Sequence, residues 1–245
     1  MHTGGLVKTV KFKNSRYVGD PIVAVKIFND KEVDELVLLD ISAGTENRPP
    51  FFERIAEIAS EAFMPMAYGG GIRTMEHAEK LFHLGIEKVV INSALATTPQ
   101  LITEVANRYG SQAVIASIDV KKGFFGKTDV YTNSGQKSAK TDPVTYAKRA
   151  EELGAGEILL TSIDQEGTME GYDLALTRAV SEAVNIPVIA SGGAGKLDDF
   201  KKAVNEGRAS AVAAGSLFVF HGRHRAVLIN YPDRKDIEAL FGPMG

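Results

Sequence analysis

The stretch PVIASGGAGKLDDF, residues 187–200, decides the fold because the chain contains a closely similar stretch upstream. Residues 65–78 read PMAYGGGIRTMEHA, again an apolar run, a glycine pair and a polar helix start, displaced by 122 positions. The same offset, without a gap, relates capping, charged and glycine positions: Asp20-Pro21 with Asp142-Pro143, Glu35 with Glu157, and Gly85 with Gly207. A collinear set of this kind indicates two halves of a repeated fold.

Strands and helices are predicted to alternate along the chain. Capping residues before Pro21, Pro99 and Pro143 predict helix starts, because a side-chain cap followed by proline suits the first helical turn. Short runs rich in Val, Ile, Leu and Ala predict buried parallel strands at 36–40, 65–68, 88–92, 113–119, 157–163, 187–191 and 210–215. Glycines that follow the helical patterns predict left-handed helix ends at Gly85, Gly110, Gly154 and Gly207.

The repeat and the alternation together predict an α/β fold, an eight-stranded (β/α) or TIM barrel built from two half-barrel repeats. No linker divides the chain, so we expect one domain over residues 1–245, with halves 1–122 and 123–245. The counterpart of strand 113–119 would precede Met1, and GGLVKTVKFKNSR (4–16) then corresponds to the hairpin-like KKGFFGKTDVYTNSGQ (121–136). We therefore expect strand one to be missing. The protein then starts further upstream, is truncated, or leaves two open sheet edges.

Composition excludes several classes of function. The 245 residues are 44% hydrophobic and carry a net charge of −3, which does not favour nucleic acid or an anionic membrane as partner. The absence of cysteine excludes disulfides, zinc–thiolate sites and a cysteine nucleophile. The five histidines lack metal-ligand spacing, so we expect no metal site and no cofactor. Without a membrane-spanning run or a signal peptide, we expect a soluble cytoplasmic protein.

Two pairs of glycine-rich loops are candidate phosphate sites, because glycine lets backbone N–H groups approach an anion at a helix start. The pairs are Gly70-Gly71 with Asn92-Ser93, and Gly192-Gly193 with Gly215-Ser216. A single glycine pair can be a purely structural turn. Two symmetry-related pairs predict a ligand with a phosphate at each end.

Asp119 is the candidate catalytic residue, because it ends the strand 113–119 at the height where a barrel places catalytic carboxylates. It could instead cap the following loop. Asp40 and Asp164 also end or follow strands, although Asp164 could merely shape a turn. Ser134 and Thr161 are candidate hydrogen-bond partners for a substrate, with loop solvation as the alternative.

The sequence resembles a known family over nearly its whole length. The runs DELVLLDI, AYGGGIRT, VVINSALATTP, YGSQAVIASIDVK, GAGEILLTSIDQEGTMEGYD and PVIASGGAGK are similar to the cyclase subunit of imidazole-glycerol-phosphate synthase. The resemblance implies a (β/α) barrel that adds ammonia from a glutaminase subunit to a bisphosphorylated ribulosyl substrate. The products would be imidazole glycerol phosphate and aminoimidazole carboxamide ribotide. Asp119 matches one of the family's two catalytic aspartates, and the other lies on the missing strand.

The resemblance also implies a partner surface. Glu35, Lys88 and Glu157 stand at strand starts and resemble the family's ring of charges at the ammonia entrance, on the amino-terminal face where the glutaminase docks. The alternative is that these residues are solvated charges at the rim of the barrel.

The first loop is closer to paralogues from surface-polysaccharide gene clusters, which supply ammonia for sugar amidination. Three functions therefore stay open: a complete cyclase, an ammonia-conducting paralogue, and a phosphate-binding regulatory barrel without chemistry.

Overall fold

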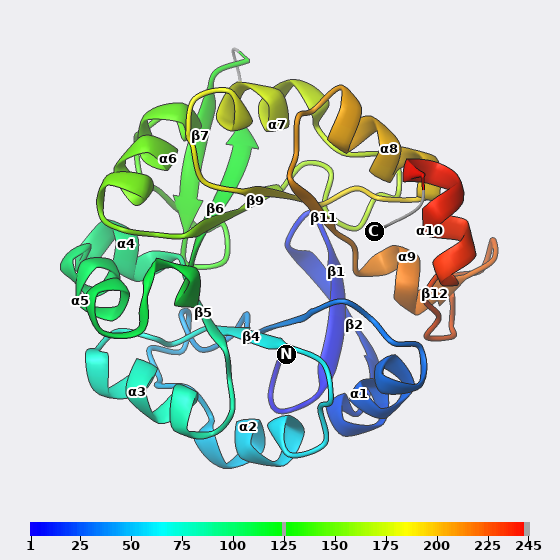
Figure 1. Cartoon of the computed structure of the whole chain (residues 1–245), viewed down its shortest axis with the longest axis horizontal. Coiled ribbons are helices and arrows are strands. Elements are labelled where there is room, and N and C mark those ends of the chain that lie inside the picture. Colours follow the sequence, from blue (N-terminus) through cyan, green and yellow to red (C-terminus); the bar gives the residue numbers. More distant parts are fainter. Residues whose placement is uncertain (124–125, 243–245) are drawn as a thin grey trace.

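Seven parallel strands form a curved sheet with helices around its outer side in the computed structural model, which describes residues 1–123 and 126–242 (Figure 1). In sheet order the strands are β11 (Ala211–Ala213), β10 (Val188–Ser191), β9 (Glu157–Ser162), β6 (Val114–Lys122), β5 (Lys88–Ile91), β4 (Met66–Gly69) and β3 (Leu36–Leu39). All seven were predicted from the sequence. Apolar runs suit parallel strands that are covered on both faces, as in β4 and β5, which are buried over most of their length.

The helices are α1 (Pro21–Asp30), α2 (Phe52–Ala59), α3 (Met75–His83), α4 (Ser93–Thr97), α5 (Gln100–Tyr109), α6 (Pro143–Glu152), α7 (Leu174–Ser181), α8 (Leu197–Asn205), α9 (Ser216–Val219) and α10 (Arg234–Phe241), with a 3₁₀ turn at Ser111–Ala113. The predicted caps of α1 and α6 are confirmed. Asp20 accepts hydrogen bonds from Ile22 N and Val23 N, and Asp142 accepts one from Thr145 N.

The repeat predicted from the sequence is present in the structure. Helices α1, α2 and α3 begin and end 122 positions before α6, α7 and α8, and β4 does so before β10. Two local predictions were wrong. Helix α5 begins after Pro99, because Thr98 still closes α4 with a bond from its N–H to Ala94 O. The left-handed residue after α8 is Arg208 (φ 57°), not Gly207.

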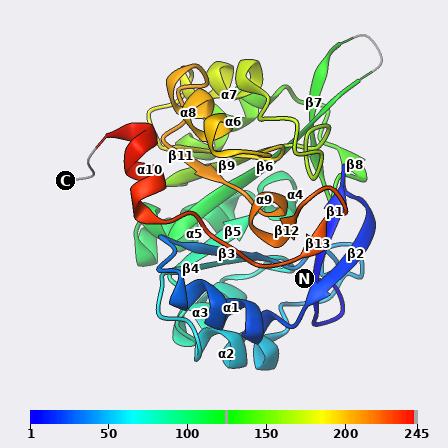
Figure 2. The same ribbon diagram turned by 90° about the vertical axis from the view of Figure 1, so that its right-hand side faces the viewer.

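Two antiparallel hairpins project at the carboxyl ends of the sheet strands. The predicted first hairpin is β1 (Leu6–Val10) with β2 (Lys13–Gly19), and Figure 1 shows β1 across the interior of the ring. The second extends β6 through β7 (Thr128–Thr132) and β8 (Lys137–Ser138); residues 124 and 125 of its predicted stretch lie outside the described residues. Figure 2 shows both hairpins at one end of the molecule, and a short pair, β12 (Phe220–His221) with β13 (Ala226–Val227), follows α9.

The main core lies between the sheet and its helices. Ile55, Leu81, Ile102 and Ile158 are fully buried there, and Tyr68 is the largest of the fully buried side chains. The strands at the two ends of the sheet order, β3 and β11, each contain an exposed residue, whereas Val89, Val90 and Ile91 of the interior strand β5 are buried. Within the described part of the chain, no helix is both long and apolar enough to cross a membrane.

Candidate functional site

A cavity of about 1080 Å³ opens at the carboxyl ends of the strands and continues along β3. It brings together most residues predicted for the site: Gly70, Gly71, Asn92, Ser93, Asp119, Ser134, Thr161 and Gly215. Three of the predicted phosphate-loop residues do not line it. Gly192 and Gly193 follow the lining residue Ser191, and Ser216 follows Gly215. The cavity is therefore lined by the first predicted pair of loops, at Gly70 and Asn92, and reaches only the edge of the second pair, at Gly192 and Gly215.

The glycines are required by the backbone. Gly70 has φ 119° and Gly192 has φ 87°, a region that favours glycine. A Cβ on Gly70 would lie 2.4 Å from Asp40 O, and one on Gly192 would lie 2.8 Å from Ser162 O. Since Asp40 and Ser162 are also 122 positions apart, both halves use the same close approach between neighbouring loops. This packing explains the glycines without a ligand, and phosphate binding stays a prediction.

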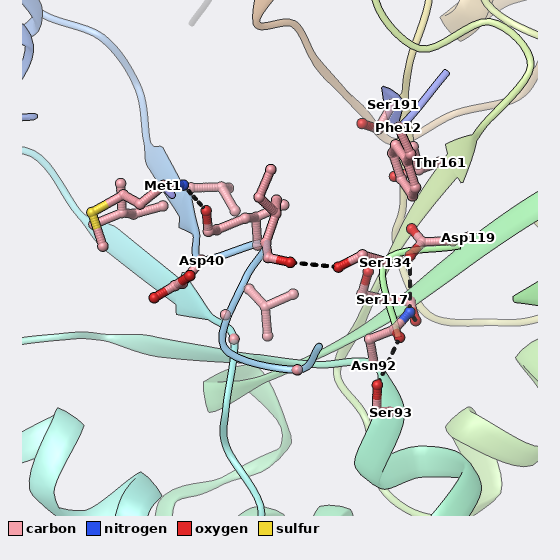
Figure 3. Close-up of a pocket in the computed structure, with 18 of the residues that line it drawn as sticks. Met1, Phe12, Asp40, Asn92, Ser93, Ser117, Asp119, Ser134, Thr161 and Ser191 are labelled. Carbon is pink, nitrogen blue, oxygen red and sulfur yellow. Dashed lines mark hydrogen bonds between the residues drawn. The ribbon is translucent and has the colours of Figure 1, made fainter. Parts of the chain in front are cut away.

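Asp119 is a buried carboxyl group at the cavity wall. Its residue is 8% exposed, and its Oδ2 accepts a hydrogen bond of 3.1 Å from Asn92 Nδ2 (Figure 3). Burial raises the pKa of Asp119, and the negative charge of Glu166 raises it further, to about 7, although the Asn92 hydrogen bond opposes the shift. A carboxyl group with this pKa can both give and take a proton near neutral pH.

Asp40 lines the same cavity but is held as an anion. It is 6% exposed and accepts hydrogen bonds from Ser42 N at 3.1 Å and from Arg48 Nη2 at 3.0 Å. Burial alone would raise the pKa of Asp40, but the hydrogen bond and charge of Arg48, together with the hydrogen bonds from Ser42, outweigh burial and hold that pKa below its usual range. Asp164 accepts a bond from Lys122 N at 2.8 Å, which supports the turn-shaping interpretation.

The remaining hydroxyl candidates lie in the cavity. Ser134 Oγ donates a 2.6 Å hydrogen bond to Ile41 O, so it ties the second hairpin region to the loop after β3. Thr161 is 6% exposed on β9 and pairs in register with Asp119 on β6. Both hydroxyl groups therefore border the space beside the buried carboxyl group.

The three charged strand-start residues meet at the amino ends of the strands, at the opposite end of the sheet from the cavity mouth. Lys88 Nζ lies 2.9 Å from Glu35 Oε2 and 2.9 Å from Glu157 Oε1. Partial burial would lower the pKa of Lys88, but the two carboxylates reverse this and raise it. The Lys88 ammonium group, at the start of β5, is therefore held between carboxylates from the starts of β3 and β9, one from each half of the repeat.

The sequence did not single out four other polar residues of this region: Lys8, Thr9, Arg48 and Glu166. They line the cavity or pair with a residue that lines it. Glu166 stands two positions after Asp164 in the stretch SIDQEGT. Its place in a loop that follows a strand is the sequence signal that could have identified it as a site residue. Among the described residues, no group of three or more His, Cys, Asp or Glu side chains has the geometry of a metal site.

The fold and cavity define an α/β protein of the (β/α) barrel type with an ionisable carboxyl group at the mouth. Residues 1–224 match the family described as histidine biosynthesis protein, and the chain belongs to that family.

Three relatives illustrate the similarity. The "Putative imidazole glycerol phosphate synthase subunit hisF2" of Pseudomonas aeruginosa is 56% identical over 94% of this chain and 91% of its own length. The "Putative imidazole glycerol phosphate synthase subunit hisF3" of Vibrio vulnificus is 49% identical over 95% and 90%. The "Imidazole glycerol phosphate synthase subunit HisF" of Alkaliphilus metalliredigens is 45% identical over 89% and 86%.

Proposed function

We propose that the protein is the cyclase subunit of a glutamine amidotransferase. In this proposal it adds ammonia to a bisphosphorylated ribulosyl substrate, closes the imidazole ring and releases aminoimidazole carboxamide ribotide. The observation that carries the proposal is Asp119, a buried carboxyl group whose pKa of about 7 suits proton transfer in ring closure and cleavage. The names of the relatives support the same reaction.

The substrate fits the mouth through its two phosphates. The loops at Gly70 and Asn92 follow β4 and β5, and those at Gly193 and Ser216 follow β10 and β11, with β6 and β9 between them. Each phosphate would meet backbone N–H groups at a helix start, and the ribulosyl centre would then lie near Asp119. Thr161 and Ser134 would donate hydrogen bonds to its hydroxyl groups.

The test measures formation of the imidazole product from ammonium ions and the bisphosphorylated substrate. We expect turnover in the wild-type protein, and protection of the Gly70 and Gly193 amides when inorganic phosphate is titrated. An active protein whose amides at both loops were unaffected by phosphate would contradict the placement. Absence of turnover with ammonium ions would contradict the reaction itself.

Ammonia is proposed to enter at the opposite face, where a separate glutaminase subunit docks over Glu35, Lys88 and Glu157. The support is the fixed ion-pair cluster at the strand starts. Replacing Lys88 by Met should lower glutamine-dependent turnover in the two-subunit complex at least tenfold more than turnover with added ammonium ions. Lys26→Met, which breaks an exposed pair with Glu61, is the matched control. Equal loss with both nitrogen sources would contradict an entrance role.

The second candidate function is an ammonia-conducting paralogue that supports amidination of a sugar. The observation that favours it is Asp40, which Arg48 helps to hold as an anion, so that Asp40 is not poised to share proton transfer with Asp119 near neutral pH. The two functions separate experimentally. A paralogue would bind the glutaminase and pass ammonia but would not convert the ribulosyl substrate.

We also propose that residues 1–245 form one domain and that an eighth parallel strand belongs between β3 and β11. Met1 supports this position, because its amino group donates to Leu39 O and its carbonyl accepts from Ile41 N at 3.0 Å. These are the two bonds of a parallel bridge beside the end of β3. A form with an apolar strand added before Met1 should melt at a higher temperature, and an equal melting temperature would contradict the proposal.

A further inference from the structure

Glu166 connects the loop after β9 to the first hairpin, 157 positions away in sequence. Its Oε2 accepts a 2.9 Å hydrogen bond from Thr9 Oγ1, and its Oε1 lies 3.6 Å from Lys8 Nζ. Its backbone carbonyl accepts a 2.9 Å bond from Lys11 N. Glu166 is 9% exposed, so these contacts are made largely out of solvent. One residue therefore holds the β1–β2 hairpin through both its side chain and its backbone.

The next residue shows how closely the two segments pack. Gly167 has φ 73°, and a Cβ at that position would lie 2.1 Å from Thr9 O. Any other residue would push the hairpin away from the loop. Arg225 fixes the same loop, because its guanidinium donates to Gly167 O at 3.2 Å and to Thr168 O at 3.1 Å. The loop is thus a rigid support on which the hairpin rests.

The contact also places a cation at the second glycine loop. A Cβ on Gly215 would lie 2.3 Å from Lys8 Nζ, so the Lys8 ammonium group rests against the Gly215 backbone. Glu166 is the carboxylate that accompanies this ammonium group. The same carboxylate acts on Asp119, since after burial its charge is the second cause that raises the pKa of Asp119.

We propose that Glu166 is a positioning residue that holds the β1–β2 hairpin over the cavity and directs the Lys8 ammonium group to the Gly215 loop. Lys8 would there neutralise the phosphate at that end of the substrate. The substrate part of this inference rests on the proposed function, whereas the attachment of the hairpin does not. Loss of Glu166 should therefore change both the mobility of the hairpin and the protonation of Asp119.

The first experiment measures hydrogen exchange of the amides of residues 6–10 and 13–19. We expect Glu166→Ala to accelerate their exchange at least tenfold. In Glu166→Gln the exchange rates should lie between those of the wild-type protein and Glu166→Ala, because the amide oxygen can still accept the Thr9 hydrogen bond but cannot form the ion pair with Lys8. Glu170→Gln, an exposed acid in the same loop, is the matched control. Equal exchange in Glu166→Ala and Glu170→Gln would overturn the attachment.

The second experiment records the pH profile of turnover with ammonium ions. Removing the charge in Glu166→Gln should move the inflection that belongs to Asp119 to lower pH, by roughly one pH unit, since a like charge no longer opposes ionisation. A merely structural role would lower activity without moving the inflection, and that result would contradict the action on Asp119. If wild-type protein proves inactive, the proposed function fails, and the exchange experiment still decides whether Glu166 holds the hairpin.

Discussion

Two buried aspartates, Asp40 after β3 and Asp119 on β6, line the same cavity and have pKa values shifted in opposite directions. Asp40 and Asp119 are 6% and 8% exposed, so both side chains are largely shielded from solvent. Arg48 holds the pKa of Asp40 below its usual range, despite burial. Burial and the charge of Glu166 raise the pKa of Asp119 to about 7, where only the Asn92 amide opposes them. Burial raises the pKa of both carboxyl groups; Arg48 and the Ser42 hydrogen bonds reverse this effect at Asp40, whereas the charge of Glu166 adds to it at Asp119.

These two charges lie in equivalent loops of the two halves. Arg48 lies in the loop after β3 and Glu166 in the loop after β9, and the strand ends before them, at Asp40 and Ser162, are repeat mates. The strands and helices of the repeat give both loops the same frame. A cation in one loop and an acid in the other then make the two sides of the cavity chemically different.

The largest effect is expected from Asp119→Asn, which replaces the carboxyl group that can exchange a proton near neutral pH by an amide that cannot. A positioned acid or base contributes about 10²–10⁴-fold, so turnover with ammonium ions should fall by that factor. Steady-state kinetics with the bisphosphorylated substrate measures the loss, and circular dichroism checks that the fold is kept. Thr132→Val, another buried polar residue near the mouth, serves as a packing control. Full activity of Asp119→Asn would exclude a catalytic role.

The same substitution should stabilise the protein in a pH-dependent way. The folded-state pKa of Asp119 is raised to about 7 from an unfolded value near 3.8, so wild-type stability falls as the pH rises between these values. Asparagine should therefore increase the free energy of unfolding at pH 8 by up to about 4 kcal/mol, at about 1.4 kcal/mol per pKa unit. Near pH 4 the difference should vanish. Urea unfolding at the two pH values decides this, and a pH-independent difference would contradict it.

Arg48→Met should make Asp40 more like Asp119. Removing the cation leaves a buried carboxylate, and we expect a loss of roughly 1–3 kcal/mol at pH 7, below the cost for a fully buried pair. The Arg48 side chain is 29% exposed, which moderates the effect. In wild-type protein the Asp40 contribution to the free energy of unfolding is lost as the pH falls through its lowered pKa; in the variant this loss should shrink or reverse, because burial then raises the pKa of Asp40. Arg178→Met, which breaks an exposed pair with Glu182, should change little.

The smallest effect is expected on the free energy of unfolding when two valines at equivalent positions of the repeat, one in β5 and one in β11, are shortened. Val90 is 3% exposed in the middle of the sheet, whereas its repeat mate Val212 is only partly buried at the sheet end. Val90→Ala should cost about 2 kcal/mol and Val212→Ala about 1 kcal/mol or less, in proportion to the apolar surface that each buries. Chemical denaturation measures both. Equal costs would show that the position of a strand in the sheet does not set its contribution.

Most of the scaffold could be predicted from the sequence. The apolar runs located all seven parallel strands, and Asp20 and Asp142 located two helix starts, because these signals are carried by residues a few positions apart. The errors at Pro99 and Gly207 were shifts of one position at helix ends, where competing hydrogen bonds decide. The 122-residue offset also paired Gly70 with Gly192, and the structure gives both glycines equivalent close contacts with the preceding loop.

The chemistry of the site was only partly predictable. Asp119, Asn92 and Thr161 were identified because each ends or follows a strand, and parallel strands end at one edge. The properties of Asp119 depend on Glu166, and those of Asp40 depend on Arg48. The sequence by itself determined the repeated frame and the strand ends, because local periodicity and glycine geometry specify them. Only the tertiary structure decided which charges meet, because Glu166 reaches Thr9 and Lys8 across 157 residues or more, a proximity that no local pattern encodes.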